Sequence, residues 1–373
     1  MPERFAIRCL LGTCALATAA LLLAAGCAQR VPAARPQVVV APATVSYVGN
    51  AVCGECHQAE FNSHRASRHA LTLRAMNRPS LGSLAPPVGS VANTWVTIKR
   101  LGEGFGVEIT GQPESLSPLD LAFGSGKTGM TYVAIVSDDT LAEVHTSYFP
   151  HERKWYVTPG QENAPDYGIG VTYRGATARR CLLCHATALP DNSLMPEKQF
   201  FGVGCESCHG PGSAHVAAMR AGDRAHLYTE QIGSWSATRI NELCGRCHRT
   251  AQDVTTPTVT SVSSTHRFQA YGLMKSACFQ NSHDTLSCLT CHNPHTNAST
   301  DRRTYEAACL GCHSPAQSAR TASATRTVQG KTCPVNAHSG CIGCHMPRRK
   351  VFADTKVSTT MPDHFIRIYR TKS

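Results

Sequence analysis

The sequence predicts a mainly α-helical and irregular fold with one small antiparallel β-sheet inserted near its N-terminal end. Short helical stretches such as 214–221 and 302–310 are joined by irregular loops. Residues 91–160, in contrast, are rich in Val, Ile, Thr, Tyr and Trp, which favour strands. The chain has 373 residues, of which 19 are cysteines, most of them at one recurring spacing. At roughly 100–200 residues per domain, this length predicts two compact units.

The first 27 residues are expected to be an export signal. Arg4 and Arg8 precede a largely apolar run over residues 9–25, which is the layout of a secretory signal peptide. Cys27 follows three small residues, as in a lipoprotein-type signal peptide, so we expect lipidation at Cys27. Simple cleavage and an uncleaved anchor are the alternatives. No later apolar run is long enough to span a membrane, which excludes a polytopic membrane protein.

Residues 28–46, rich in Pro, Ala and Val, are expected to form an extended tether. The mature chain is therefore expected on the periplasmic side of a bacterial cell envelope, an oxidising compartment. The expected partners are redox proteins of the periplasm or outer membrane, and the lipid anchor provides the contact with the membrane.

Seven copies of the motif Cys-x-x-Cys-His follow the tether, and this motif is the attachment signature of c-type haem. Its two thiols bond covalently to one porphyrin, and the histidine binds the iron from below. Zinc sites, redox thiol pairs and structural disulfides also use paired cysteines, but none requires a histidine after every pair. The predicted attachment residues are Cys53, Cys56, Cys181, Cys184, Cys205, Cys208, Cys244, Cys247, Cys288, Cys291, Cys309, Cys312, Cys341 and Cys344. The predicted proximal iron ligands are His57, His185, His209, His248, His292, His313 and His345.

Two cysteines of the mature chain lie outside the seven motifs and the lipidation site. Nineteen cysteines minus fourteen in motifs leaves five, and Cys9, Cys14 and Cys27 belong to the signal. The remaining two, Cys278 and Cys333, could form one disulfide or remain as buried free thiols. Their sequence positions do not decide between these alternatives, because disulfide geometry depends on the fold.

Eleven of the 18 histidines lie outside the motifs, enough to give every iron a second histidine ligand. His295 lies three residues after the proximal His292, too close to reach the opposite face of the same haem, so it must serve a neighbouring one. His215 and His338 are placed similarly beside motifs. The candidate distal ligands are His69, His215, His295, His338 and His364, with His266, His145 and His283 as secondary candidates. We expect the others, His64, His151 and His226, at the surface.

The motifs are spaced unevenly along the chain. Residues 58–180 separate the first motif from the second, whereas the other six fall within 181–345. The expected organisation is a first haem segment (47–90), a β-rich insert (91–160), a six-haem region (161–366) and a tail (367–373). Strands are expected at 93–100, 105–110, 131–137, 141–147 and 154–158, and the glycine-rich stretch 124–129 as a turn. With so little chain per cofactor, the haems are expected to form much of the core.

The formal net charge of +11 gives no case for nucleic-acid binding. The negative charges of the haem propionates offset most of this positive charge, so the excess of Lys and Arg is accounted for without a polyanionic partner. Nucleic acid is therefore not an expected partner.

Four segments carry a resemblance to a known superfamily: 47–57 with 67–70, 204–215, 288–295, and 341–347 with 363–365. On these the chain resembles the multihaem c-type cytochromes that include a tetrahaem cytochrome, hydroxylamine oxidoreductase and pentahaem nitrite reductase. The resemblance implies closely packed haem pairs, with distal-ligand roles for His69, His215, His295 and His364. The Cys-x-x-Cys-Lys haem of the nitrite reductases is absent, and no cross-linked tyrosine like that of hydroxylamine oxidoreductase can be placed.

The function expected from these features is electron transfer between redox partners in the cell envelope, with no catalytic residues assigned. An electron carrier is favoured over an enzyme because the haem motifs of the relatives are present, whereas their Cys-x-x-Cys-Lys haem and cross-linked tyrosine are not found. The alternative is a multihaem oxidoreductase in which one haem lacks a distal ligand and acts on a small nitrogen or oxygen compound. The first haem, isolated in sequence, is the expected location of such an open site.

Overall fold

The computed structural model describes residues 45–163, 168–254, 262–314, 330–351 and 356–369. The predicted signal, the lipidation site Cys27 and the tether up to residue 44 lie outside these residues. Within the described ranges, every helix is too short or too polar to cross a membrane.

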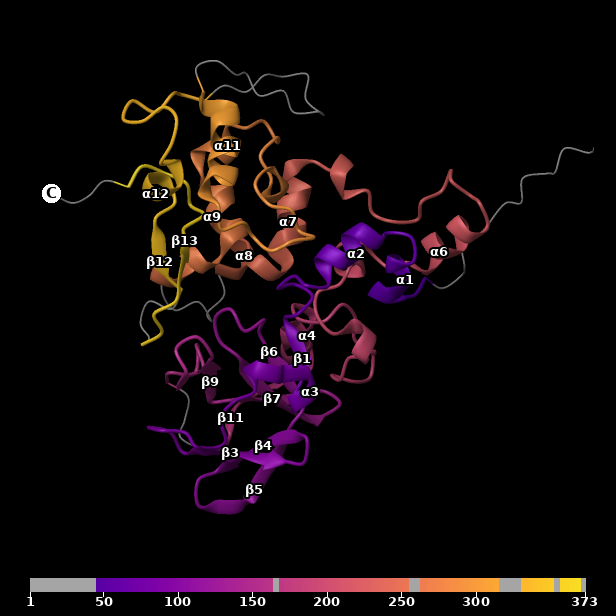
Figure 1. The fold of residues 1–373 in the computed structure, drawn as a ribbon, viewed down its shortest axis with the longest axis vertical. Coiled ribbons are helices and arrows are strands. Elements are labelled where there is room, and N and C mark those ends of the chain that lie inside the picture. The colour runs from indigo at the N-terminus through magenta and orange to yellow at the C-terminus, as the bar shows by residue number, and fades with distance from the viewer. Residues whose placement is uncertain (1–44, 164–167, 255–261, 315–329, 352–355, 370–373) are drawn as a thin grey trace, which may run out of the picture. The chain divides into compact units, whose positions relative to one another are not determined.

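The β-rich part contains one five-stranded and one four-stranded antiparallel sheet (Figure 1). The five-stranded sheet has the order β1-β6-β7-β8-β11, formed by β1 (Leu73–Ala75), β6 (Leu121–Phe123), β7 (Thr131–Ser137), β8 (Thr140–Val144) and β11 (Gly170–Arg174). The four-stranded sheet follows chain order: β2 (Gly89–Ser90), β3 (Val96–Leu101), β4 (Gly104–Ile109) and β5 (Gln112–Leu119). Two further hairpins pair β9 (Thr146–Phe149) with β10 (Lys154–Val157), and β12 (Arg348–Lys350) with β13 (Thr360–Pro362).

All five predicted strand segments contain strands, but the sheet region is larger than predicted. β5 lies outside the predicted strand segments, and it contains Pro113 and Pro118, which argue against a central strand. It is compatible with them because it lies at the edge of its sheet and pairs with β4 alone. β1 and β11 join the five-stranded sheet from outside the predicted insert, since each pairs with a strand distant in sequence. The predicted turn at 124–129 links β6 to β7.

Strands β1 to β11 lie within residues 73–174, which we call the sheet region. Apolar side chains fill two cores there. The first gathers Val96, Ile98, Phe105 and Val107 with Tyr132, all at most 1% exposed. The second core lies between the five-stranded sheet and the helix that begins at Gly175 and contains Cys181, the first cysteine of the second motif. There Leu121, Val133 and Leu141 pack with Ala178 and Leu182. The second motif is therefore attached to the sheet through ordinary hydrophobic packing.

The rest of the described chain is helical and irregular. The predicted helices at 214–221 and 302–310 correspond to α6 and α11. Ser236 and Asp301 cap the two longest helices, α7 and α11, by accepting the backbone amides of Arg239 and Arg303. The helices are α1 (Asn50–Gly54), α2 (Gln58–His64), α3 (Arg78–Leu81), α4 (Gly175–Leu183), α5 (Glu206–His209), α6 (Ser213–Arg220), α7 (Ala237–His248), α8 (Ala251–Val254), α9 (Gln269–Lys275), α10 (Ala277–Gln280), α11 (Arg302–His313) and α12 (Cys341–His345).

A buried carboxylate joins the first motif to the third, despite their separation in sequence. Glu206, in the third motif, is 3% exposed. It accepts backbone amides from Val48 and Gly49 ahead of the first motif and from Gly212 after its own, each at 2.8 Å. The first haem segment is thus fixed against the third motif.

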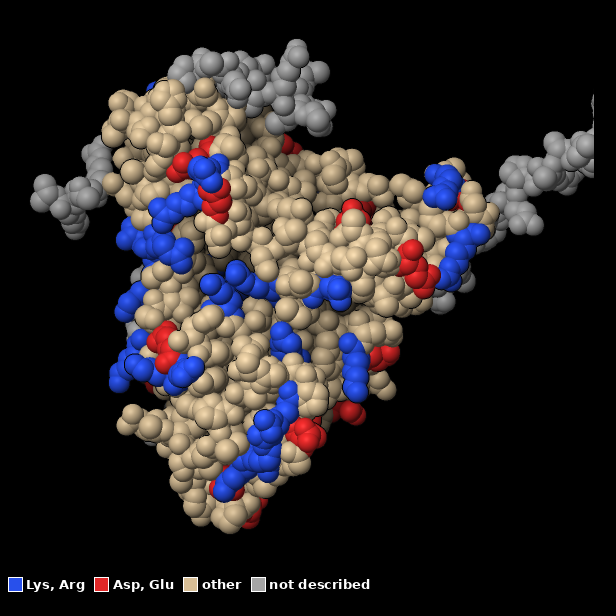
Figure 2. All heavy atoms as spheres, in the orientation of Figure 1, with Lys and Arg blue, Asp and Glu red and all other residues tan. Residues whose placement is uncertain are grey.

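Charged side chains are spread over the surface. On the face shown in Figure 2, Lys and Arg side chains are distributed over much of the molecule, with Asp and Glu side chains among them.

Candidate metal centres

In most of the motifs a single helical turn brings the first cysteine and the histidine to one face. The amide of His57 bonds to the carbonyl of Cys53 at 2.9 Å. His209 and His292 make the same bond to Cys205 and Cys288, at 3.0 and 2.9 Å. Because residues four apart share a helix face, the thiols and imidazole of each motif can meet the same porphyrin.

Four motif histidines each face a second histidine at nearly the same separation. The ring centroids of His57 and His215 are 6.2 Å apart, and those of His292 and His364 are also 6.2 Å apart. His209 lies 6.3 Å from His295, and His248 lies 6.1 Å from His69. Every second histidine in these pairs comes from the predicted set of distal candidates.

This separation matches the space that one iron needs between two imidazoles. A histidine nitrogen binds a transition metal at about 2.0 Å and the ring centroid lies about 1.1 Å further, so two opposed rings are about 6.2 Å apart. A direct stack of the two rings would be much closer. The residues therefore fit a six-coordinate haem iron at each of the four positions.

Hydrogen bonds orient these rings so that one nitrogen remains for a metal. The Nδ1 atoms of His215 and His364 lie 2.7 and 3.1 Å from the carbonyl oxygens of Leu227 and Pro362. Nδ1 of His248 lies 3.1 Å from Oε1 of Gln269. Such contacts fix the tautomer in which Nδ1 donates and Nε2 is free to bind a metal.

Burial favours the neutral, metal-binding form of several of these imidazoles. Desolvation lowers the pKa of His248 and His292, and it lowers the pKa of His364 to about 4. A neutral imidazole can donate its nitrogen lone pair without first losing a proton. The electrostatic environment therefore agrees with the geometry.

The second motif has a different environment. Nδ1 of His185 lies 2.9 Å from Oγ1 of Thr72, and its ring stacks on Phe123 with centroids 4.5 Å apart. His185 also lines a cavity of about 280 Å³ against the five-stranded sheet. Glu143 contributes a polar group to its wall. The other lining residues are Phe123, Gly124, Thr128, Gly129, Thr131, Ser147, Phe149 and Pro159.

The sixth and seventh motif histidines are oriented in the same way as the others. Nδ1 of His313 lies 2.8 Å from the Lys331 carbonyl oxygen, and Nδ1 of His345 lies 3.1 Å from that of Arg367. In both, Nε2 is the nitrogen left for a metal.

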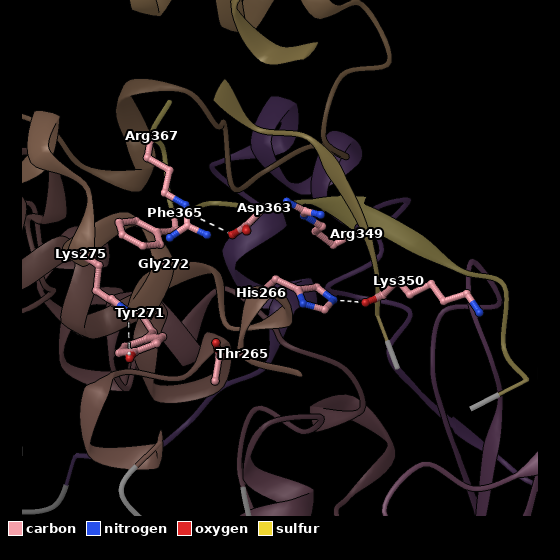
Figure 3. A pocket seen from close by; sticks show the side chains of 10 residues that line it. All are labelled: Thr265, His266, Tyr271, Gly272, Lys275, Arg349, Lys350, Asp363, Phe365 and Arg367. Carbon is pink, nitrogen blue, oxygen red and sulfur yellow. Dashed lines mark hydrogen bonds between the residues drawn. The ribbon is translucent and has the colours of Figure 1, made fainter. Parts of the chain in front are cut away.

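A cationic cavity of about 400 Å³ lies close to the seventh motif (Figure 3). Its cationic lining residues are Lys275 from α9, Arg349 from β12, and Arg367 near the C-terminal end. The carbonyl oxygen of Arg367 also lies within hydrogen-bond distance of Nδ1 of His345. Asp363 is the acidic residue of the lining and is bonded to Tyr369. This lining suits anionic groups such as carboxylates. His266, a secondary candidate, also lines the cavity and contacts the carbonyl of Lys350.

The remaining candidate histidines lie elsewhere. His145 is buried in the sheet region, with its ring 4.2 Å from that of Trp95. His338 is exposed, and Asn336 accepts its backbone amide. His283 is an exposed residue with a φ of 51° in the loop before the fifth motif. The structure does not bring these three to a motif histidine in the way it does the four pairs.

One histidine expected at the surface is buried. His64, at the end of α2, is only 7% exposed, and it lies within electrostatic range of His69 and His295. Desolvation is the largest cause lowering its pKa. Sequence reasoning missed His64 because nothing nearby in sequence shows that α2 is covered by segments from the third and fifth motifs.

Contacts between cysteines relate the motifs to one another. Four pairs of cysteines lie close enough for each thiol to shift the pKa of the other: Cys53 with Cys205, Cys184 with Cys247, Cys244 with Cys288, and Cys309 with Cys341. Each contact joins two different motifs, so it brings the attachment points of two porphyrins together. Cys278 and Cys333 are not bonded to each other, and both are partly exposed free thiols rather than buried ones.

Comparisons with known proteins found one family model and two solved structures that are similar to this chain. The family model described as "Cytochrome c554 and c-prime" matches residues 148–210, which include the second and third motifs. Two solved structures are similar. The outer cell wall cytochrome OcwA has 15% identity and a TM-score of 0.49, with 86% of this chain and 79% of that chain covered. The undecahaem cytochrome from the S-layer of Carboxydothermus ferrireducens has 16% identity and a TM-score of 0.44, with 88% and 53% covered.

No curated protein matches the sequence. The family match and the repeated motif together support a multihaem c-type cytochrome with covalently bound haem.

Proposed function

We propose that this chain is a seven-haem c-type cytochrome that transfers electrons between redox partners in the cell envelope. A c-type haem supplies a one-electron iron couple whose potential depends on axial ligands, hydrogen bonds and burial. The observation that carries the proposal is the set of four histidine pairs at 6.1–6.3 Å. Two nitrogen ligands on an iron leave no position for a substrate, which is the arrangement an electron carrier needs.

The axial pairs we propose are His57 with His215, His209 with His295, His248 with His69, and His292 with His364. In all four pairs the second histidine comes from a segment distant in sequence from the motif histidine that it faces, so the ligands cross-link the chain. Neighbouring motifs then share short segments, such as the eight residues 288–295 that supply ligands to two irons.

The cysteine contacts support a route through the motifs. Cys53 and Cys205 connect the first motif to the third, and Cys244 and Cys288 connect the fourth to the fifth. Cys208 lies within electrostatic range of Cys244, and Cys291 within range of Cys309. Together with the proximity of Cys309 and Cys341, these place the motifs next to one another in the order first, third, fourth, fifth, sixth and seventh. The second motif lies beside the fourth, through Cys184 and Cys247.

Localisation and partners belong to the same proposal. The export signal and the covalent haem motifs support a position on the periplasmic side, with Cys27 as the lipid anchor to the membrane. The partners would be redox proteins of the periplasm or outer membrane.

Haem stoichiometry and spectra test the proposal. Seven haems per chain should be found by pyridine haemochrome assay and by intact mass, with low-spin ferric spectra for the paired positions. The purified protein should be reduced and reoxidised reversibly by small one-electron donors and acceptors. A colourless mature chain, or one with the mass of the bare peptide, would overturn the proposal.

A second function is favoured by one observation, the cavity at His185. Among the described residues, no second histidine ring is opposed to His185 as one is to each of the four paired motif histidines, and the phenyl of Phe123 stacks against its imidazole. A haem held there would have room for a small nitrogen or oxygen compound next to Glu143. The expected location of an open site therefore moves from the first haem to the second, because His215 faces His57. A high-spin ferric signal that shifts on adding cyanide, nitrite or hydroxylamine would support the enzyme, and fully low-spin spectra that ignore these ligands would exclude it.

A further inference from the structure

Two asparagines occupy equivalent positions in different parts of the chain. Asn50 lies three residues before Cys53, the first cysteine of the first motif. Asn241 lies three residues before Cys244, the first cysteine of the fourth motif. Both side chains point to another motif rather than to their own.

The hydrogen bonds of the two asparagines are alike. Oδ1 of Asn50 accepts the backbone amide of Cys205, which opens the third motif, at 2.9 Å. Oδ1 of Asn241 accepts the backbone amide of Cys288, which opens the fifth motif, also at 2.9 Å. In each case an asparagine just before one motif bonds to the first residue of a motif later in the chain. The backbone amide that it bonds is at the start of a short helix, where it has no partner within the helix.

The surroundings show that neither contact is incidental. Asn241 is fully buried, and its Nδ2 donates to the carbonyl of Leu286 at 3.3 Å. A Cβ added at Gly204 would lie 2.4 Å from Oδ1 of Asn50, so only glycine before Cys205 lets that side chain approach. In the same two motif pairs the first cysteines, Cys53 with Cys205 and Cys244 with Cys288, lie close enough to shift one another's pKa.

The other motifs show what the asparagine contributes. In the sixth motif the equivalent residue is Glu306, which lies within electrostatic range of Cys341, the first cysteine of the seventh. In the second motif it is Ala178, which is buried in the core of the sheet region. Of the three contacts between first cysteines, two therefore have an asparagine at this position and the third, between Cys309 and Cys341, has a glutamate.

We propose that Asn50 and Asn241 are positioning residues that hold two haem pairs edge to edge, one formed by the first and third motifs and the other by the fourth and fifth. Each cysteine sulfur marks the edge of a porphyrin, so adjacent sulfurs bring two edges together. Electron transfer slows steeply as this gap widens, and a neutral amide fixes the gap without adding charge. The inference rests on the proposed electron-transfer function.

Substitutions at Asn241 test the inference in the full, haem-loaded protein. Asn241→Leu keeps the size and removes the acceptor, whereas Asn241→Asp keeps an acceptor oxygen. The exposed Asn281, whose amide bonds only to Ala277 in its own helix, gives the matched control Asn281→Leu. Haem content by pyridine haemochrome and mass is measured first, followed by the spin–spin interaction between ferric haems in electron paramagnetic resonance and by intramolecular electron-transfer rates after flash reduction.

We expect Asn241→Leu to retain its haems, lose or alter one spin–spin interaction, and slow one intramolecular electron-transfer phase. Asn241→Asp keeps the acceptor oxygen and should keep the spin–spin interaction, while its charge and the lost donor to Leu286 shift the potentials of the nearby haems. Asn281→Leu should match the parent protein. If Asn241→Leu does not mature, the half-exposed Asn50→Leu provides the same comparison for the first pair.

A leucine variant with full haem content and unchanged interaction and rates would overturn the inference, as would an aspartate variant that behaves like the leucine one. Either result would leave the proposed function standing, because haem content and reversible reduction of the parent protein are measured separately.

Discussion

The sheet region and the haem-motif region reach stability by different means. In the sheet region, side chains such as Ile98, Phe105 and Tyr132 are at most 1% exposed and fill a core. In the motif region, α11, α12 and the turn at Cys288–Thr290 contain no buried residue. The motif region has some buried apolar residues, such as Ile240, Phe268 and Leu273, but both large clusters of buried apolar side chains lie in or against the sheet region.

This difference indicates what covalent haem does for the fold. A porphyrin bound between two histidines would bury the exposed faces of these short helices. Because it is attached by covalent thioether bonds, it would remain in place. Folding of the motif region is then coupled to haem loading, as small metal domains fold with their metal. The sheet region needs no such partner, because its strands already bury their apolar faces.

The largest expected effect comes from removing one haem attachment. Cys288→Ser with Cys291→Ser should eliminate the fifth haem and unfold the motif region after residue 262, because ligands from this segment serve two irons. The sheet region should persist. Limited proteolysis with mass spectrometry would show cleavage throughout the motif region and protection of residues 89–174.

The matched control is Cys278→Ser, a free thiol outside the motifs, which should keep seven haems and the parent digestion pattern. A double variant with six intact haems and native protection of the motif region would show that side chains suffice there, and the comparison between the two regions would fail.

The converse experiment disturbs the sheet core. Phe105→Ala removes a side chain that is 1% exposed and should lower the free energy of unfolding of the sheet region by about 3–5 kcal/mol. The low-spin signals of the four paired haems should not change, because their ligands lie outside the sheets. Leu116→Ala, at a site that is 39% exposed, should change stability by no more than about 0.5 kcal/mol. Loss of paired-haem signals in the Phe105 variant would argue against two separate cores.

Sequence patterns predicted what short-range chemistry determines. The motif spacing identifies attachment residues and proximal histidines because one helical turn brings them together. Strand composition located β3, β4, β7 and β8 because alternation is a local signal. His69, His215, His295 and His364 were also named as candidates, helped by a resemblance to a superfamily.

Long-range placement was beyond the sequence. The gap of 58–180 suggested an isolated first haem, but Glu206 and Asn50 fold that segment back onto the third motif. His185 was treated like the other motif histidines, and only the packing of α4 on the sheet places Phe123 against it. Which distal histidine faces which proximal one depends on these packings, so spacing could not assign the pairs.

A smaller effect is expected at the contact that holds the first segment in place. Glu206→Ala leaves the amides of Val48, Gly49 and Gly212 without their acceptor in a buried site, which should cost about 3 kcal/mol. The low-spin signal of the haem bound by His57 and His215 should broaden or change. Glu206→Gln keeps one acceptor oxygen and should cost less. Thermal unfolding followed in the haem bands measures both, and equal stability of the alanine variant and the parent would show that this carboxylate does not join the two segments.

The smallest effect lies where the two regions meet, at Glu143 beside the His185 cavity. Burial raises the pKa of this carboxyl, while hydrogen bonds from Gln161 and Tyr173 oppose the shift. A raised pKa means that the folded state holds the proton more tightly than the unfolded state, in which glutamate titrates near about 4.3. Stability should therefore fall as pH rises from the unfolded pKa through the folded one, and then level off.

Glu143→Gln should abolish this part of the pH dependence and so be more stable than the parent above the folded pKa, whereas the exposed Glu114→Gln should leave the profile unchanged. Denaturant unfolding of the sheet region across this pH range measures the difference. If the glutamine variant retained the parent profile, the carboxyl would not be desolvated by the sheet. The wall of the cavity at His185 would then be open to water, and the sheet region would not extend its dry core to the second motif.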